Sequence, residues 1–129
     1  MVKIREIMTR RLVSIDANKT VREAVQMMTD LKLGSLLVKR GNELIGILEE
    51  TDIMRNLLAK DLNAYVVKVE AVMSIPFVIG EEKTDDDASD LMIKQNVRRL
   101  VVSDGNSIVG LISMRDLVRP VYAGRSLWS

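Results

Sequence analysis

The sequence predicts a mixed α+β fold made of two copies of one βαββα unit, because the chain repeats itself in register. The second half matches the first at a constant offset of 64 residues, and upstream Met8-Thr9 matches Met73-Ser74 at an offset of 65. The pairs that share the first offset are Gly41 with Gly105, Asn42 with Asn106, Gly46 with Gly110, and Asp52 with Asp116. We therefore divide the chain into two units, residues 1–64 and 65–129.

Each copy has the pattern strand, helix, strand, strand, helix. Short apolar runs predict leading strands at 12–14 and 77–79, and the capping boxes Thr20–Glu23 and Thr84–Asp87 mark the helix that follows. A Gly-Asn turn then joins two β-rich runs, at 35–39 with 43–48 and at 99–103 with 107–112. The closing helices are expected near 50–60 and 113–122. A short helix is expected within the linker 61–71.

One such unit cannot cover both faces of its own sheet. We expect the two units to pack as a pseudo-twofold pair, with the sheets facing each other and the helices outside. The alternative is two independent small domains. The linker argues against that alternative because residues 61–71 contain no Gly, Pro or Ser.

The composition removes several function classes. The 129 residues include no Cys and no His, which excludes thiolate and imidazole chemistry and leaves only oxygen ligands for a metal. Asp85–Asp87 suit the first turn of a helix better than a metal site, so we expect no metal. Without His or Cys, an enzyme would need carboxylate or lysine chemistry, so we expect the protein to have no catalytic activity. Having no membrane-length apolar run and no signal-peptide pattern, the chain is expected to be cytoplasmic.

The strand–helix junction of each copy resembles the signature of the cystathionine β-synthase (CBS) domain family, Gly-hydrophobic-hydrophobic-Ser/Thr-x-x-Asp. Residues 110–116, Gly-Leu-Ile-Ser-Met-Arg-Asp, match it fully, whereas in residues 46–52 Glu49 replaces the Ser/Thr. The resemblance covers nearly the whole chain and is that of a stand-alone tandem CBS pair. It implies binding of AMP, ADP, ATP or S-adenosylmethionine in clefts between the units, regulation of an unidentified effector protein or self-association, and a homodimer.

The second junction has groups that suit a nucleotide. The start of a helix favours a phosphate, Ser113 can donate to a phosphate or ribose oxygen, and Asp116 can accept from ribose hydroxyls. Gly110 is expected to let ligand and backbone approach closely. Arg98 stands where some members of the family place a phosphate-binding arginine, and nearby apolar residues can flank the adenine. The predicted nucleotide-binding residues are Ser113, Asp116, Arg98, Arg115, Leu111, Ile75, Pro76, Phe77 and Val78.

The first junction is predicted to bind phosphate poorly. Glu49 puts a carboxylate where a phosphate would lie, and Gly34 occupies the position aligned with Arg98. We expect this site to be empty, or to take a nucleoside or an uncharged or cationic group. Its predicted residues are Asp52, Thr51, Ile47, Leu12 and Val13.

Other interpretations remain open at this point. Ser113–Asp116 is also a capping box, which many helices have without any ligand. The chain would then be a scaffold or oligomerisation protein with degenerate ligand clefts. Nucleic-acid binding is a weaker alternative, because the net charge is only +1 and aromatic residues are few. The tail that contains Trp128 is expected either to be disordered or to dock on a partner subunit, and docking is the favoured interpretation.

Overall fold

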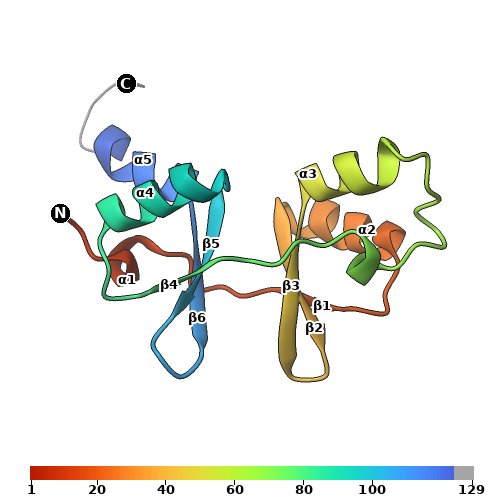
Figure 1. The fold of residues 1–129 in the computed structure, drawn as a ribbon, viewed down its shortest axis with the longest axis horizontal. Helices are drawn as coiled ribbons and strands as arrows, with labels where there is room; N and C mark the ends of the chain where they lie inside the picture. Colours follow the sequence, from red (N-terminus) through yellow and green to blue (C-terminus); the bar gives the residue numbers. More distant parts are fainter. Residues whose placement is uncertain (124–129) are drawn as a thin grey trace. The chain divides into compact units, whose positions relative to one another are not determined.

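The computed structural model describes residues 1–123, which form a mixed α+β fold with two three-stranded sheets, as predicted (Figure 1). The chain divides into two compact units. The central unit is residues 13–75. The terminal unit combines residues 1–12 with the chain from Pro76 onward.

In the central unit the sheet has the order β1-β2-β3, with β1 parallel and β3 antiparallel to β2. One helix connects β1 to β2, a second follows β3, and a short 3-10 turn lies in the linker. The elements are β1 (Ser14–Asp16), α2 (Val21–Leu31), β2 (Ser35–Arg40), β3 (Glu43–Glu49), α3 (Glu50–Ile53), the π-helical η1 (Met54–Leu58) and η2 (Val69–Ala71).

The terminal unit repeats this topology in the order β4-β5-β6. Its additional element is a single helical turn near the N-terminus. The elements are α1 (Ile4–Ile7), β4 (Val78–Gly80), α4 (Asp85–Gln95), β5 (Arg99–Ser103), β6 (Ile108–Ser113) and α5 (Met114–Ala123).

Most local predictions are confirmed. Both predicted capping boxes form, and Gly41 and Gly105 have φ values of 64° and 102°, the left-handed turn conformation expected for them. The leading strands begin later than predicted, at Ser14 and Val78. The pairing explains this shift, because the residue before each strand, Val13 or Phe77, contributes only its carbonyl to the neighbouring strand.

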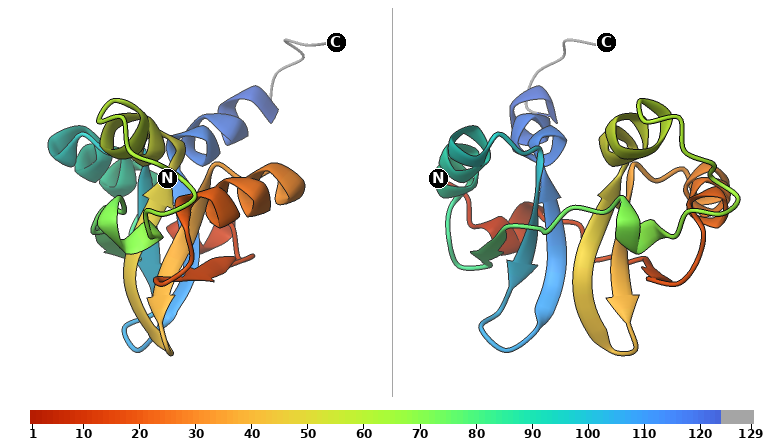
Figure 2. Two further views of the ribbon diagram at one scale, coloured as in Figure 1. Left: turned by 90° about the vertical axis from the view of Figure 1, so that its right-hand side faces the viewer. Right: turned by 45° about the vertical axis from the view of Figure 1, so that its right-hand side comes forward.

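Each sheet buries one face under its own helices (Figure 2). Successive strand residues point to opposite faces, so one alternating set enters this core. In the central unit, the strand residues of the core are Ile15, Leu36, Val38 and Leu48, packed with Val21, Ala24 and Met28 of α2. In the terminal unit they are Ile79, Leu100, Val102 and Ile112, packed with Ala88 and Met92 of α4 and Ile4 of α1.

The two copies exchange their leading segments. Thr9 forms two backbone hydrogen bonds with Leu111 of β6, of 2.8 and 2.9 Å. Ser74 forms the equivalent pair with Ile47 of β3, both of 2.9 Å. The compact units are therefore a different division of the chain from the two sequence repeats. Each copy's leading segment completes the sheet of the other copy.

The repeated glycine of each β3 or β6 strand makes this exchange possible. A Cβ atom on Gly110 would lie 2.6 Å from the Met8 sulfur and 2.9 Å from the Thr9 carbonyl oxygen. A Cβ atom on Gly46 would meet Met73 and lie 3.1 Å from the Ser74 carbonyl oxygen. The expectation that Gly110 admits a ligand is therefore corrected, because the exchanged Met-Thr segment occupies that space.

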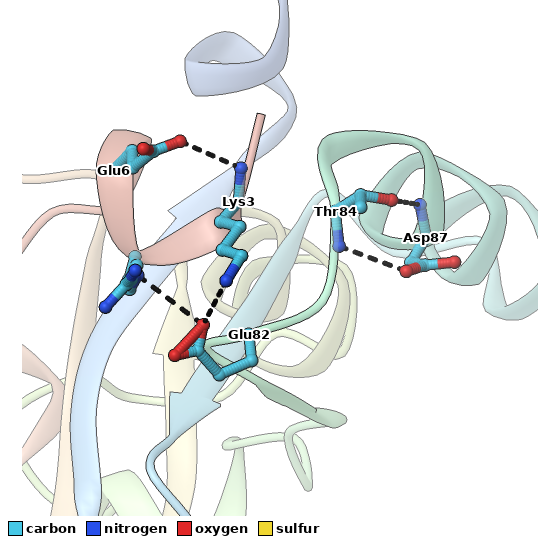
Figure 3. A network of polar contacts seen from close by, with 6 residues as sticks. Lys3, Glu6, Glu82, Thr84 and Asp87 are labelled. Carbon is cyan, nitrogen blue, oxygen red and sulfur yellow. Dashed lines mark hydrogen bonds and ion pairs between the residues drawn. The ribbon is translucent and has the colours of Figure 1, made fainter. Parts of the chain in front are cut away.

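Polar contacts hold the N-terminal segment on the start of α4 (Figure 3). Lys3 and Arg5 both form ion pairs with Glu82, at 3.2 and 3.5 Å.

Close by, the backbone N–H and hydroxyl of Thr84 hydrogen-bond with Asp87 and lower the pKa of that carboxyl. A carboxyl with a lowered pKa stabilises the fold above its unfolded pKa, and this support is lost as the pH falls through the folded value.

We expect Gly110→Ala to lower the free energy of unfolding by about 2 kcal/mol, since the new methyl group overpacks against the Thr9 carbonyl. Urea denaturation measures this. Gly80→Ala is the matched control, because its Cβ would meet only a lysine side-chain carbon at 3.8 Å. The control should change stability by less than about 0.5 kcal/mol. Equal effects of the two substitutions would refute the close-approach explanation.

Candidate functional site

The face of the terminal sheet that its own helices leave uncovered contains several predicted site residues. Paired residues on neighbouring strands point to the same face. Val78 pairs with Val101, which pairs with Leu111, and Arg99 pairs with Ser113. These side chains therefore share one face, opposite the core residues Leu100 and Ile112.

The β6–α5 junction presents a buried carboxylate beside a helix start. Oδ2 of Asp116 accepts hydrogen bonds from the Ser113 backbone N–H (2.8 Å) and hydroxyl (3.1 Å). Asp116 is only 8% exposed, yet no residue that the structure describes donates to its Oδ1. Every fully buried side-chain polar atom in the described residues has a partner. Among the described residues, Oδ1 of Asp116 therefore has no donor, whereas Oδ2 has two.

Three arginines surround this junction. The backbone N–H of Met114 donates to the Arg98 carbonyl (2.8 Å), which places Arg98 at the start of α5. Arg115 is in the first turn of that helix, and both side chains are exposed. Neither forms an ion pair with any described residue. The third, Arg99, is not among the predicted site residues. Counting strand positions back from the Gly-Asn turn would pair it with Ile112, and the register shift between Val102 and Ser103 brings it opposite Ser113 instead.

The predicted adenine-flanking residues are only partly brought together. Val78 is 53% exposed on β4, which is an edge strand. The Phe77 carbonyl and the Glu81 N–H bond to β5, so the backbone N–H and C=O of Val78 point out of the sheet edge. Pro76 precedes this strand in the same unit. Ile75 does not join the group within the terminal unit, because it ends the central unit, where it is 73% exposed.

In the central unit, both carboxylate oxygens of the equivalent aspartate are occupied. Oδ2 of Asp52 accepts from the Glu49 N–H (2.8 Å), and Oδ1 accepts from the Ser74 hydroxyl (2.5 Å). Asp52 is 7% exposed, and the buried Ile47 is the strand residue that pairs with Ser74.

The other predicted residues of this second site do not all gather around Asp52. Thr51 is half-buried in α3, next to Asp52. Val13 lies just before β1, whereas Leu12 ends the terminal unit. Because α3 has only four residues before the π-helical segment, its start is a weaker anion site than that of α5.

The two junctions have opposite charge. Both contain one buried aspartate, but the residues around it differ at every charged position. The terminal junction has Arg98, Arg99, Ser113, Met114 and Arg115, where the central junction has Gly34, Ser35, Glu49, Glu50 and Thr51. Three arginines thus surround the terminal aspartate, whereas two further carboxylates accompany the central one.

This tandem βαββα architecture, with its duplicated Gly-x-x-x-x-x-Asp junction, defines a class of paired repeat proteins. The CBS domain family profile matches residues 4–59 and 69–122, and the chain belongs to this family. The CBS domain-containing protein YhcV of Bacillus subtilis is 30% identical over 118 residues, which cover 91% of this chain and 84% of that protein.

Solved structures show the same fold. A putative signal-transduction protein with CBS domains from Burkholderia ambifaria has a TM-score of 0.84 and 30% identity, over 92% of this chain and 88% of that one. The CBS domain protein PAE2072 from Pyrobaculum aerophilum, solved in complex with AMP, has a TM-score of 0.82 and 22% identity, over 95% and 97% of the two chains.

Two further expectations from the sequence concern membrane-spanning segments and the docking of Trp128. Among the described residues, no helix combines the length and apolar character needed to cross a membrane. The docking expected for Trp128 concerns a residue outside the described part of the chain.

We expect Ser74→Ala to destabilise the protein by about 2 kcal/mol, because it leaves Oδ1 of the buried Asp52 carboxylate without its hydrogen-bond donor. Thermal or urea unfolding measures this. The aligned Thr9→Ala is the control, since the structure gives the Thr9 hydroxyl no bond to any described residue, and it should cost less than about 0.5 kcal/mol. A double-mutant cycle with Asp52→Ala should show coupling. Additive effects would contradict a direct Ser74–Asp52 interaction.

Proposed function

We propose that the protein is a non-catalytic regulatory module that binds an adenine nucleotide at the terminal-unit junction. The observation that carries the proposal is Asp116, a buried carboxylate with one oxygen held by Ser113 and the other without a donor among the described residues. A ribose presents hydroxyl donors of the kind that this oxygen can accept. The AMP complex of the Pyrobaculum relative supports the choice of ligand.

The sheet supplies complementary groups for the rest of a nucleotide. The outward N–H and C=O of Val78 offer one donor and one acceptor, which suit N1 and the amino group of adenine. Strands β4 and β6 are two strand spacings apart, about 10 Å, a separation that a nucleoside can span. The start of α5 and Arg98 then suit the phosphate. We place Ser113, Asp116, Arg98, Arg115, Leu111, Pro76, Phe77 and Val78 at this site.

The central-unit junction is proposed to hold no phosphate. Asp52 already satisfies both its oxygens within the protein, and Glu49 and Glu50 would repel an anion. This satisfied carboxylate is also the observation that favours the second candidate function, a scaffold, for this half of the chain. S-adenosylmethionine stays a possible ligand by its adenosine group, but the arginines of the terminal junction favour a phosphate.

The output of such a module requires another molecule. We propose that ligand binding acts on an effector protein or on self-association, with a homodimer as the expected assembly.

AMP, ADP or ATP is expected to raise the melting temperature. A ligand at about 100 times its Kd adds about 2.7 kcal/mol of stability, which differential scanning fluorimetry detects. Asp116→Ala should abolish most of the shift, because the ribose loses its acceptor. Asp52→Ala is the matched control, since it removes the equivalent helix-start carboxylate of the other junction, and it should preserve the shift.

Two outcomes would count against the proposal in different ways. If no adenine nucleotide stabilises the wild-type protein, the scaffold function is favoured. If the nucleotide raises the melting temperature of Asp116→Ala as much as that of the wild type, the ligand binds elsewhere.

A further inference from the structure

We propose that the leading segment of the terminal unit, residues 2–9, is a releasable strap, which leaves its sheet while the equivalent segment of the central unit, residues 67–74, stays docked. The observation behind this inference is a pair of side-chain hydrogen bonds that fastens the central segment to its closing helix. The strap has no counterpart of these bonds among the described residues. The inference goes beyond the proposed function and does not depend on it.

The strap and the central segment are docked alike by their backbones and apolar residues. Near the start of each, a backbone N–H donates to the loop before the long helix, from Ile4 to Lys83 and from Val69 to Lys19, at 2.8 and 2.9 Å. Ile4 and Val69 are both fully buried. Each segment ends in the reciprocal pair of backbone bonds to its outer strand, and each has ion pairs on the surface, which contribute little. These shared contacts therefore do not distinguish the two segments.

Two side chains of the closing helix hold the central segment in addition. Oδ1 of Asp52 accepts from the Ser74 hydroxyl (2.5 Å), and the side-chain amide of Asn56 donates to the Val72 carbonyl (3.0 Å). Asp52 and Asn56 come from successive turns of α3 and η1, so the helix fastens the segment at two points. Val72 is 1% exposed and Asp52 is 7% exposed. Release of the central segment therefore leaves poorly solvated acceptors without their donors, which is costly.

The strap lacks both bonds. Thr9 is aligned with Ser74, but its hydroxyl bonds to no described residue. The position aligned with Asn56 is Pro120, a residue type without a side-chain hydrogen-bond donor. Release of the strap thus breaks two fewer hydrogen bonds than release of the central segment, and the strap opens at a lower free energy.

The docked strap lies next to the candidate ligand site. In the central unit the same backbone pairing brings Ser74 within hydrogen-bonding distance of Asp52, so docking of the strap places Thr9 beside Asp116. One consequence rests on the proposed function. A nucleotide at Asp116 should favour the docked strap, since a ligand that binds one of two states better shifts the equilibrium towards that state.

Amide hydrogen exchange of the whole protein, followed by NMR, compares two matched pairs of amides. Thr9 and Leu111 form one reciprocal pair of bonds, and Ser74 and Ile47 form the other. After correction for intrinsic exchange rates, we expect the Thr9–Leu111 pair to exchange at least about tenfold faster than the Ser74–Ile47 pair. The amides of the core strands β2 and β5 serve as the reference for global unfolding.

The Ser74→Ala/Asn56→Ala double variant removes both fastening bonds. Relative to the β2 amides, exchange at Ile47 should accelerate to within about threefold of the exchange at Leu111, which should stay unchanged. Thr9→Ala is the matched control, because it removes a hydroxyl without a bond, and it should alter neither pair. Equal protection of the two pairs in the wild type would overturn the strap. Unchanged relative protection of Ile47 in the double variant would overturn it too.

A second arm of the experiment adds AMP at a concentration that raises the melting temperature. We expect AMP to slow exchange at Leu111 at least about threefold relative to Ile47. A raised melting temperature without this relative slowing would refute the coupling between ligand and strap. If AMP, ADP and ATP all fail to raise the melting temperature, the proposed function fails, and the comparison of the two amide pairs still decides whether the strap exists.

Discussion

The rest of the structure depends on the docking of two short segments, each on the middle of the outer strand of a sheet. Each docking consists of a pair of backbone hydrogen bonds, from Thr9 to Leu111 and from Ser74 to Ile47. It requires a strand residue without a side chain, because the preceding methionine lies over Gly110 or Gly46. The glycine of the family signature is thereby explained by packing within the protein. The residue that follows the methionine is held near the strand–helix junction, where the signature aspartate lies.

The same backbone therefore supports two different chemistries. In both units the signature aspartate caps the helix through one oxygen, which accepts the N–H of Glu49 or Ser113. That bond depends on the turn from strand to helix, and it tolerates changes in every neighbouring side chain. The charges around it are free to diverge, so one junction has collected arginines and the other carboxylates. Architecture and ligand preference are consequently set by separate atoms of the same short motif.

Much of the fold could be predicted from the sequence, because it follows from local signals. The capping boxes at Thr20 and Thr84 and the Gly-Asn turns each act within a few residues, and the repeat verifies each signal twice. The segment exchange could not be predicted in this way. Nothing within four residues of Thr9 indicates that its partner is Leu111, about a hundred positions away. The same limit applies to Ile75 and Leu12, which lie where the chain passes between units and whose place at either site stays a prediction.

The candidate site was predictable in its aspartate and serine, but not in its hydrogen bonding. The sequence aligns Asp52 with Asp116, and only the structure distinguishes their free oxygens. Arg99 is not among the predicted site residues, because its position beside Ser113 depends on the register between β5 and β6. The difference in charge between the aligned positions of the two repeats can be read from the sequence. The register of the β5–β6 hairpin then shows that the arginines lie at the same junction.

The contrast between Asp52 and Asp116 also suggests how one repeat could lose a ligand while the other keeps it. Ser74 donates a hydroxyl to Oδ1 of Asp52, the same kind of donor that a ribose would offer to Oδ1 of Asp116. The protein thus supplies from its own exchanged segment a hydrogen bond that has no counterpart among the described residues of the other junction. A buried carboxylate oxygen needs a donor in either case, because leaving it unpaired is costly. An internal hydroxyl meets that need permanently, whereas under the proposed function an external hydroxyl meets it only when a nucleotide is bound.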